Sequence, residues 1–226
     1  MNRAVFLDRD GVINEIVYFP ELGLLDSPLN PKQFKLLPQV AEAIGVFNRL
    51  GVKVIVLSNQ PAIAKGKMTM EAFEGIRQKM RNELGKKGAH IDAEYYCFHH
   101  PSAKDAKYKG NCDCRKPKPG LFLRAAKDFG LNLSKCYAVG DSLTDVKAGE
   151  SVGCRTFLIG YLKCDLCKFM EGEDARPDLI VPSLFAASKI IEEEISGGIK
   201  PNLMVSKVFH TSGIIEKEAN ENGNIP

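Results

Sequence analysis

The feature that most constrains the fold is the regular alternation of short apolar runs with longer helix-like stretches. Short, largely apolar runs rich in β-branched and aromatic residues are typical of strands that are covered on both faces. These runs are Ala4–Leu7, Val52–Leu57, Tyr95–Cys97, Tyr137–Val139, Arg155–Ile159 and Leu179–Val181. Strands that alternate with helices in this way form a doubly wound, Rossmann-like parallel sheet of the α/β class.

Between the apolar runs, apolar residues recur at helical spacing. They predict helices over Val40–Leu50, Thr69–Leu84, Gly120–Phe129, Leu143–Ala148 and Leu184–Ile195. Residues 15–38 contain several prolines and predict an irregular flap. We expect one domain over residues 1–195, with no room for a large cap domain between its first two strands. Residues 196–226 are polar and predict a tail that is mobile or ordered by a partner.

The composition argues against nucleic-acid and membrane partners. The net charge is +3, and Lys and Arg form no long basic run. The apolar stretch near the N-terminus is too short for a signal peptide, and no stretch reaches the length of a membrane span. We therefore expect a cytoplasmic protein, with a monomer favoured. Seven cysteines without an export signal make disulfides unexpected.

Polar side chains gather directly after the predicted strands, where open α/β sheets bind their ligands. These side chains are Asp8 and Asp10, then Ser58, Asn59 and Gln60, then Asp141, with Asp145 one turn later. Such residues also cap helices, which is the simpler explanation for any single position but a poor one for all of them together. Clustered carboxylates are tolerated around a divalent cation, and oxygen ligands suit Mg²⁺. Magnesium in turn indicates a phosphate substrate.

A transferred phosphoryl group also needs a positive charge nearby, and the segment Arg115-Lys116-Pro117-Lys118-Pro119-Gly120 offers several. The segment precedes a predicted helix, whose N-terminus favours anions. The sequence contains no P-loop pattern, so nucleotide hydrolysis of that kind is not indicated.

Together these residues resemble the haloacid dehalogenase (HAD) superfamily of phosphatases. The resemblance rests on DRDG after the first strand, SN after the second, the lysine of RKPKPG, and GDSLTD after the fourth, and it covers roughly residues 3–185. All four motifs in this order are a strong signal, whereas DxDG alone is a moderate one. The resemblance implies a HAD-like fold and a magnesium-dependent phosphoric monoester hydrolase that forms an aspartyl-phosphate.

The resemblance also implies a role for each motif residue. Asp8 would be the nucleophile, and Asp10 would protonate the leaving oxygen and then deprotonate water. Ser58 and Lys116 would stabilise the phosphoryl oxygens. Mg²⁺ would bind Asp8, the backbone carbonyl of Asp10, and Asp141. Asp145 would orient Lys116, and the substrate contacts would come from Ser58, Asn59, Gln60, Arg115 and Lys116.

A second metal site is predicted from a compact set of cysteines and histidine. Cys97, His99, Cys112 and Cys114 form C-x-H-x12-C-x-C, which supplies the four ligands of a structural zinc site. His100 is an alternative ligand, although spacing favours His99, and scattered thiols are the simpler alternative for the whole set. Zinc would order the loop 97–114, which lacks an apolar period, and would so position the cations that follow it. We expect the separate pair Cys164 and Cys167 to be ordinary free thiols.

The zinc loop narrows the resemblance to one branch, which contains D-glycero-D-manno-heptose 1,7-bisphosphate 7-phosphatase and the histidinol-phosphate phosphatase domain. The long loop and RKPKPG favour removal of the 7-phosphate from the heptose bisphosphate. Histidinol phosphate or another sugar phosphate is the alternative substrate. The family typically shows NQSGIARG after the second strand, and this chain departs from it with NQPAIAKG over residues 59–66.

Two functions from other classes compete with a phosphatase. A phospho-receiver domain of a signalling protein also uses Asp, Ser or Thr and Lys on a doubly wound sheet. A receiver carries its phosphoacceptor on a middle strand, whereas here D-x-D follows the first strand and a zinc loop comes later. A catalytically silent binding protein would not need the complete set of acids. We therefore predict an enzyme acting on a small phosphorylated metabolite, with Mg²⁺ and Zn²⁺ as cofactors.

Overall fold

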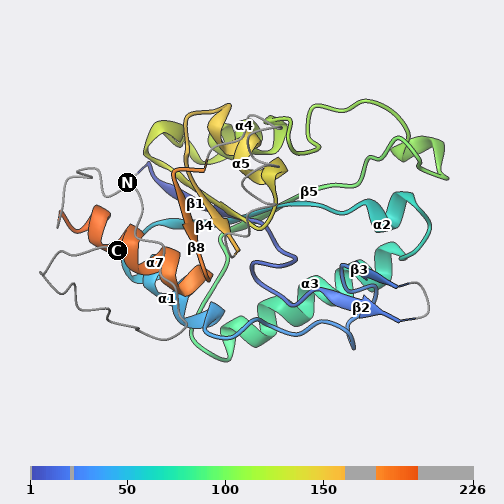
Figure 1. The fold of residues 1–226 in the computed structure, drawn as a ribbon, viewed down its shortest axis with the longest axis horizontal. Coiled ribbons are helices and arrows are strands. Elements are labelled where there is room, and N and C mark those ends of the chain that lie inside the picture. The colour runs from blue at the N-terminus through green and yellow to red at the C-terminus, as the bar shows by residue number, and fades with distance from the viewer. Residues whose placement is uncertain (1, 21–22, 161–176, 198–226) are drawn as a thin grey trace, which may run out of the picture.

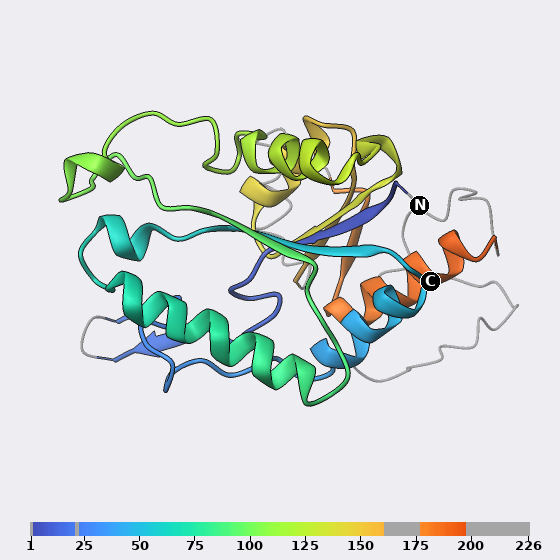
Figure 2. The same cartoon turned by 180° about the vertical axis from the view of Figure 1, so that it is seen from behind.

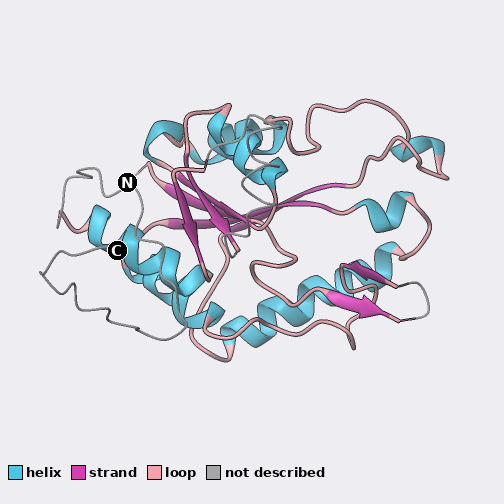
Figure 3. Ribbon diagram, viewed as in Figure 1, coloured by secondary structure: helices cyan, strands magenta, loops and turns pink. Residues whose placement is uncertain are grey.

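The computed structural model describes residues 2–20, 23–160 and 177–197. Its centre is a six-stranded parallel sheet with the strand order β5-β4-β1-β6-β7-β8 (Figures 1 and 3). In chain order the strands are β1 (Ala4–Leu7), β4 (Lys53–Asn59), β5 (Ala93–Cys97), β6 (Tyr137–Gly140), β7 (Arg155–Ile159) and β8 (Leu179–Val181). The predicted doubly wound parallel sheet is therefore confirmed.

Helices cover both faces of the sheet (Figures 1 and 2). One face packs against α1 (Val40–Arg49), α3 (Met70–Gly85) and α7 (Leu184–Ile195). The opposite face packs against α4 (Gly120–Phe129), with Ala148 of α5 (Leu143–Glu150) in the same core. Successive residues of β1 serve the two cores in turn, since Val5 belongs to the first and Phe6 to the second. This burial on both faces is why the strands read as continuous apolar runs.

The flap predicted as irregular over residues 15–38 contains a hairpin. Strands β2 (Val17–Phe19) and β3 (Leu24–Asp26) pair in antiparallel fashion, with Tyr18 opposite Leu25. Both of these side chains are exposed, so the hairpin shows no apolar alternation that sequence reasoning can detect. Lys67 ties the hairpin to the segment before α3 through an ion pair of 2.8 Å with Asp26. Three short elements were also not predicted: α2 (Pro61–Ala64) and the 3-10 turns Ala106–Tyr108 and Leu133–Lys135.

Helix ends agree closely with the sequence signals. Thr69 caps α3, because its Oγ1 accepts a hydrogen bond of 3.1 Å from the backbone N–H of Ala72. Within the described ranges, no helix is both long and apolar enough to span a membrane. Cys164, Cys167 and the tail from residue 198 onward lie outside the described residues, so the predictions for them and the domain division at residue 195 remain predictions.

Candidate active site

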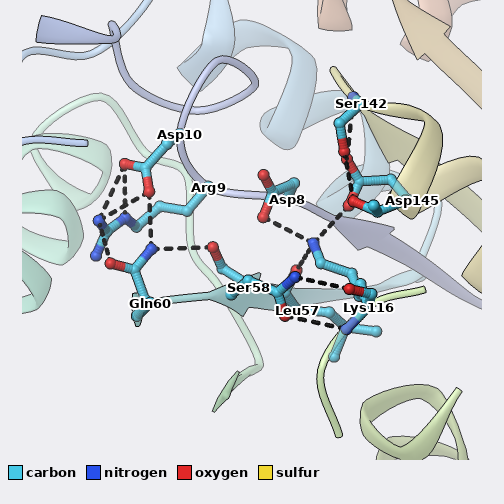
Figure 4. Close-up of polar contacts among 11 residues, drawn as sticks. Asp8, Arg9, Asp10, Leu57, Ser58, Gln60, Lys116, Ser142 and Asp145 are labelled. Atoms are coloured by element: carbon cyan, nitrogen blue, oxygen red, sulfur yellow. Dashed lines mark hydrogen bonds and ion pairs between the residues drawn. The ribbon is translucent and has the colours of Figure 1, made fainter. Parts of the chain in front are cut away.

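Three neighbouring strands bring the candidate catalytic residues to one edge of the sheet. Strand β1 lies between β4 and β6, and all three run parallel. Asp8 therefore leaves β1 beside Ser58 at the end of β4 and Asp141 just after β6. The backbone N–H of Asp8 donates to the carbonyl of Val139 over 3.0 Å, which fixes where the Asp8 side chain starts. The predicted convergence of acids and hydroxyl at this edge is present (Figure 4).

Lys116 reaches this edge from the loop before α4. Its Nζ lies 2.8 Å from Asp8 Oδ1 and 2.6 Å from Asp145 Oδ1, and it donates to the carbonyl of Leu57 over 2.6 Å. The side chain is only 4% exposed. Burial lowers the pKa of Lys116, but the charges and hydrogen bonds of Asp145 and Asp8 outweigh burial and raise it overall. The ammonium group therefore remains charged against Asp8.

Asp145 is held in place by the start of α5. Its Oδ2 accepts from the Ser142 hydroxyl over 2.7 Å and from the Ser142 backbone N–H over 3.1 Å, which leaves Oδ1 for Lys116. Gly140 leaves no space for a side chain here, because a Cβ at that position would lie 2.2 Å from the Cβ of Asp145. The predicted contact between Asp145 and Lys116 is thus built by the local sequence GDSLTD.

Asp8, Asp141 and Asp145 form an acidic cluster, each offering a carboxylate oxygen within 4.8 Å of the others. Burial and the neighbouring charges of Asp8 and Asp145 raise the pKa of Asp141 to about 7, although Lys116 opposes the shift. Gly11 closes one side of the cluster: its φ is +79°, and a Cβ there would lie 2.1 Å from Asp141 Oδ2. The carboxylates of this cluster repel one another, and a bound cation would neutralise that repulsion. Because carboxylate oxygens are hard donors, Mg²⁺ is a fitting cation.

The Asp10 carboxylate lies in a separate network beside the acidic cluster. Its Oδ1 accepts a hydrogen bond from Arg9 Nε over 3.1 Å, and Arg9 Nη2 lies 3.0 Å from both Oδ1 and Oδ2. Gln60 Nε2 donates to it over 2.7 Å, and Asn14 Nδ2 over 3.0 Å. Figure 4 shows Asp10 turned toward Arg9 and Gln60, with Ser58 on the far side of the Gln60 amide. Arg9 and Asn14 were not predicted as site residues.

The four predicted zinc ligands come together at the end of β5. Cys97 Sγ lies 3.1 Å from Cys114 Sγ, 3.6 Å from Cys112 Sγ and 3.7 Å from His99 Nδ1. Tetrahedral zinc places its sulfur ligands about 3.8 Å apart and sulfur from nitrogen about 3.6 Å apart. His100 faces elsewhere, because its Nδ1 accepts from the backbone N–H of Ser102 over 3.0 Å. The separations of 3.6 and 3.7 Å agree with these values, while the Cys97–Cys114 pair is closer, so the donor set is compatible with zinc, with His99 as the single nitrogen ligand.

Sequence comparison identifies relatives that cover most of the chain. D-glycero-beta-D-manno-heptose-1,7-bisphosphate 7-phosphatase of Vibrio cholerae serotype O1 is 36% identical over 156 residues, which are 69% of this chain and 80% of the relative. The enzyme of the same name from Yersinia pestis is 30% identical over 190 residues, 84% of this chain and 95% of the relative. A family model described as HAD-hydrolase-like matches residues 113–187.

This chain belongs to the HAD superfamily of phosphatases. Membership confirms the predicted enzyme class, a phosphoric monoester hydrolase. The fold agrees: the crystal structure of D,D-heptose 1,7-bisphosphate phosphatase from B. bronchiseptica, complexed with magnesium and phosphate, superposes with a TM-score of 0.70. That structure is 28% identical in sequence and covers 86% of this chain and 99% of its own.

The structure also shows how this HAD chain joins the cysteine-bearing loop 97–114 to the candidate active site. The Asn59 side chain clamps the backbone of Lys116, accepting from its N–H over 3.0 Å and donating to its carbonyl over 3.1 Å. Arg115 donates to the carbonyl of His99 over 3.3 Å, and Lys118 to the carbonyl of Cys112 over 2.8 Å. The loop that carries the cysteines is therefore fastened directly to the backbone that positions Lys116.

Proposed function

We propose that this phosphatase removes the 7-phosphate of D-glycero-β-D-manno-heptose 1,7-bisphosphate through an aspartyl-phosphate on Asp8. The observation that carries the proposal is the buried Lys116 ammonium, held 2.8 Å from Asp8 in the acidic cluster of a chain whose relatives bear this activity by name. A lysine fixed against a carboxylate in this way is suited to hold a phosphoryl group beside its nucleophile.

The reaction proceeds in two displacements at phosphorus. An Asp8 carboxylate oxygen attacks, the bond from phosphorus to the sugar oxygen breaks, and Asp10 gives its proton to that leaving oxygen. Asp10 then takes a proton from water, which attacks the phosphorus of the aspartyl-phosphate. The bond from phosphorus to the Asp8 oxygen breaks, so inorganic phosphate leaves, Asp8 is again a carboxylate and Asp10 again carries its proton.

Lys116 and the Ser58 hydroxyl stabilise the negative charge on the transferred oxygens. Asn59 and Gln60, which the sequence suggested as substrate contacts, have intramolecular partners: Asn59 bonds the Lys116 backbone, and Gln60 is fully buried. We therefore assign these two amides to positioning the site, and we keep Arg115 as the substrate contact.

Both metals find fitting donors. Asp8, Asp141 and the backbone carbonyl of Asp10 would hold Mg²⁺, which when bound neutralises charge on the phosphoryl group. Asp145 is committed to Lys116 and Ser142 and would stay outside the ligand set. Cys97, His99, Cys112 and Cys114 would hold a structural Zn²⁺, since all four positions are protein ligands.

The second phosphate of the substrate would meet cations around the zinc loop. Burial, followed by the charges of Lys65 and Arg115, lowers the pKa of His100, which is consistent with positive charge around this loop. The backbone of Lys104 is held next to Lys65 in the chain, because its N–H donates to the carbonyl of Ala64 over 2.8 Å. Cations on the loop that leads into Lys116 would favour a bisphosphate over a monophosphate.

The test is phosphate release with Mg²⁺ from the two anomers of the heptose 1,7-bisphosphate, with fructose 1,6-bisphosphate and histidinol phosphate as competitors. We expect the β-anomer to give the highest kcat/KM, with phosphate retained at C1 of the product, and Asp8→Asn to abolish the reaction. A preference for histidinol phosphate or for fructose 1,6-bisphosphate would reject the heptose assignment.

A further inference from the structure

Arg9 is an unexpected residue to find buried beside two catalytic carboxylates. Its side chain is 0% exposed, and its guanidinium faces both oxygens of Asp10. An arginine guanidinium stays charged even when it is buried, and here Asp10 supplies the opposite charge at 3.0 Å. A buried charge of this kind costs stability unless it has a specific partner and task.

Arg9 determines which way the Gln60 amide faces. An arginine carries only donors, so the amide atom of Gln60 that lies 2.9 Å from Arg9 Nη2 has to be the oxygen. The other end of the amide is then the nitrogen, which donates to Asp10 Oδ2 over 2.7 Å and to Ser58 Oγ over 3.0 Å. Because Gln60 is 0% exposed, water cannot compete for these bonds.

The direction of the bond to Ser58 has a chemical consequence. Ser58 Oγ accepts from the Gln60 amide, so its own proton is not used in that contact and can be given to another acceptor. In the reaction that acceptor is a phosphoryl oxygen. A carboxylate in place of the amide would reverse the bond and take the Ser58 proton for itself.

The guanidinium also contacts an aromatic ring of the core. The ring of Phe73, on α3, has its centroid 5.7 Å from the Arg9 guanidinium carbon. The guanidinium carbon of Arg77 lies 5.9 Å from the centroid of the same ring. Arg77 Nε forms an ion pair of 2.8 Å with Oε2 of Glu94, whose side chain is buried. Arg9 therefore contacts both Asp10 and the buried core residue Phe73.

We propose that Arg9 and Gln60 are positioning residues for the two chemical steps. Arg9 fixes the orientation of the Gln60 amide, and this amide holds the Asp10 carboxylate while it leaves the Ser58 proton free for the phosphoryl group. The inference rests on the proposed aspartyl-phosphate mechanism but is independent of which phosphate ester is the natural substrate.

Two aryl phosphates test the proposal on the full-length enzyme. Phenyl phosphate has a leaving oxygen that needs a proton from Asp10, whereas p-nitrophenyl phosphate has one that departs without it. For Gln60→Leu and for the isosteric Gln60→Glu we expect kcat/KM to fall about 100-fold with phenyl phosphate and about 10-fold with p-nitrophenyl phosphate. Arg9→Met should behave in the same way, and Arg9→Lys, which keeps a charged donor, should recover part of the loss.

The matched control is Gln78→Leu, which removes an amide from the exposed face of α3 and should leave both rates unchanged. Circular dichroism and thermal unfolding identify any variant that fails to fold, and Gln60→Glu, which keeps the shape of the side chain, then carries the test. Equal losses with the two substrates, or no difference between Arg9→Lys and Arg9→Met, would overturn the proposal. Wild-type activity on aryl phosphates without activity on the heptose bisphosphate would reject the proposed substrate and leave this test intact.

Discussion

Magnesium affinity should fall about tenfold between pH 8 and pH 6. Burial and the nearby Asp8 and Asp145 raise the pKa of Asp141 to about 7, and Mg²⁺ binds only the ionised carboxylate. With that pKa, Asp141 is about 90% ionised at pH 8 and about 10% ionised at pH 6. The apparent dissociation constant for Mg²⁺ should rise in the same proportion.

The free energy of unfolding of the metal-free protein should fall as pH rises, whereas the affinity for Mg²⁺ should rise. A raised carboxyl pKa means that the stability contributed by protonated Asp141 is fully present below its unfolded pKa and is lost as pH rises through about 7. Bound Mg²⁺ restores that stability above pH 7, because it neutralises the ionised cluster. The shift in Tm on adding Mg²⁺ should therefore grow from pH 6 to pH 8.

Calorimetric titration of Mg²⁺ at pH 6, 7 and 8, together with thermal unfolding, measures both effects. Asp141→Asn should bind weakly and lose the pH dependence over this range. Asp113→Asn is the control, because Asp113 is 71% exposed and lies outside the acidic cluster. The reasoning is refuted if the wild-type affinity is the same at pH 6 and pH 8, or if Asp141→Asn keeps the wild-type pH dependence.

Three further changes test other parts of the site. Lys116→Met leaves Asp8 and Asp145 without their buried cation. It should therefore lower the free energy of unfolding by about 3–5 kcal/mol in urea and lower kcat at least about 100-fold. Unchanged stability would contradict this. Cys114→Ser removes one of the four predicted zinc ligands, so it should reduce bound zinc, measured by elemental analysis. It should also lower activity, because the loop that carries these ligands leads directly into Lys116. Full activity without zinc would disprove this dependence of activity on zinc. Gly11→Ala and Gly153→Ala both place a side chain at positive φ, and this backbone strain should cost each variant about 1 kcal/mol. Only Gly11→Ala should also lose Mg²⁺ affinity, since its Cβ would strike Asp141 while that of Gly153 meets open space. Equal metal binding by both would argue against the cluster.

The central sheet was predictable because both of its faces are buried. Continuous apolar runs such as Ala4–Leu7 have no exposed face to interrupt them, and the strand there has the predicted bounds. Strand β4 ends later than predicted, because Ser58 and Asn59 are polar yet remain in the ladder with β5. The polar residues at the candidate active site therefore also made the predicted end of this strand too early.

The β2–β3 hairpin was beyond sequence reasoning for the opposite reason. Its order comes from backbone pairing and from the ion pair between Asp26 and Lys67, while Leu24 and Leu25 are exposed. Exposed apolar residues among prolines give no periodic signal. Helix α2 was missed because it is a single turn, begun by Pro61, in the segment that departs from the family pattern.

The acids and cations of the candidate active site were predicted from their places after the strands and from the family motifs. Arg9 and Gln60 were not recognised as a positioning pair, because an arginine between two acids is expected to face solvent. Their roles depend on complete burial and on the direction of the hydrogen bonds, which only the three-dimensional arrangement reveals.

The most direct test of the account is to trap the phosphoryl group on the enzyme. Asp10→Ala with Mg²⁺ and radiolabelled p-nitrophenyl phosphate should still complete the first displacement, because this leaving group needs no proton, but should hydrolyse the intermediate slowly. After acid quench, the account predicts a hydroxylamine-sensitive label in the peptide that contains Asp8, and no label in Asp8→Asn/Asp10→Ala. A label on Ser58, on a histidine or on no residue at all would contradict the assignment of Asp8 as the nucleophile.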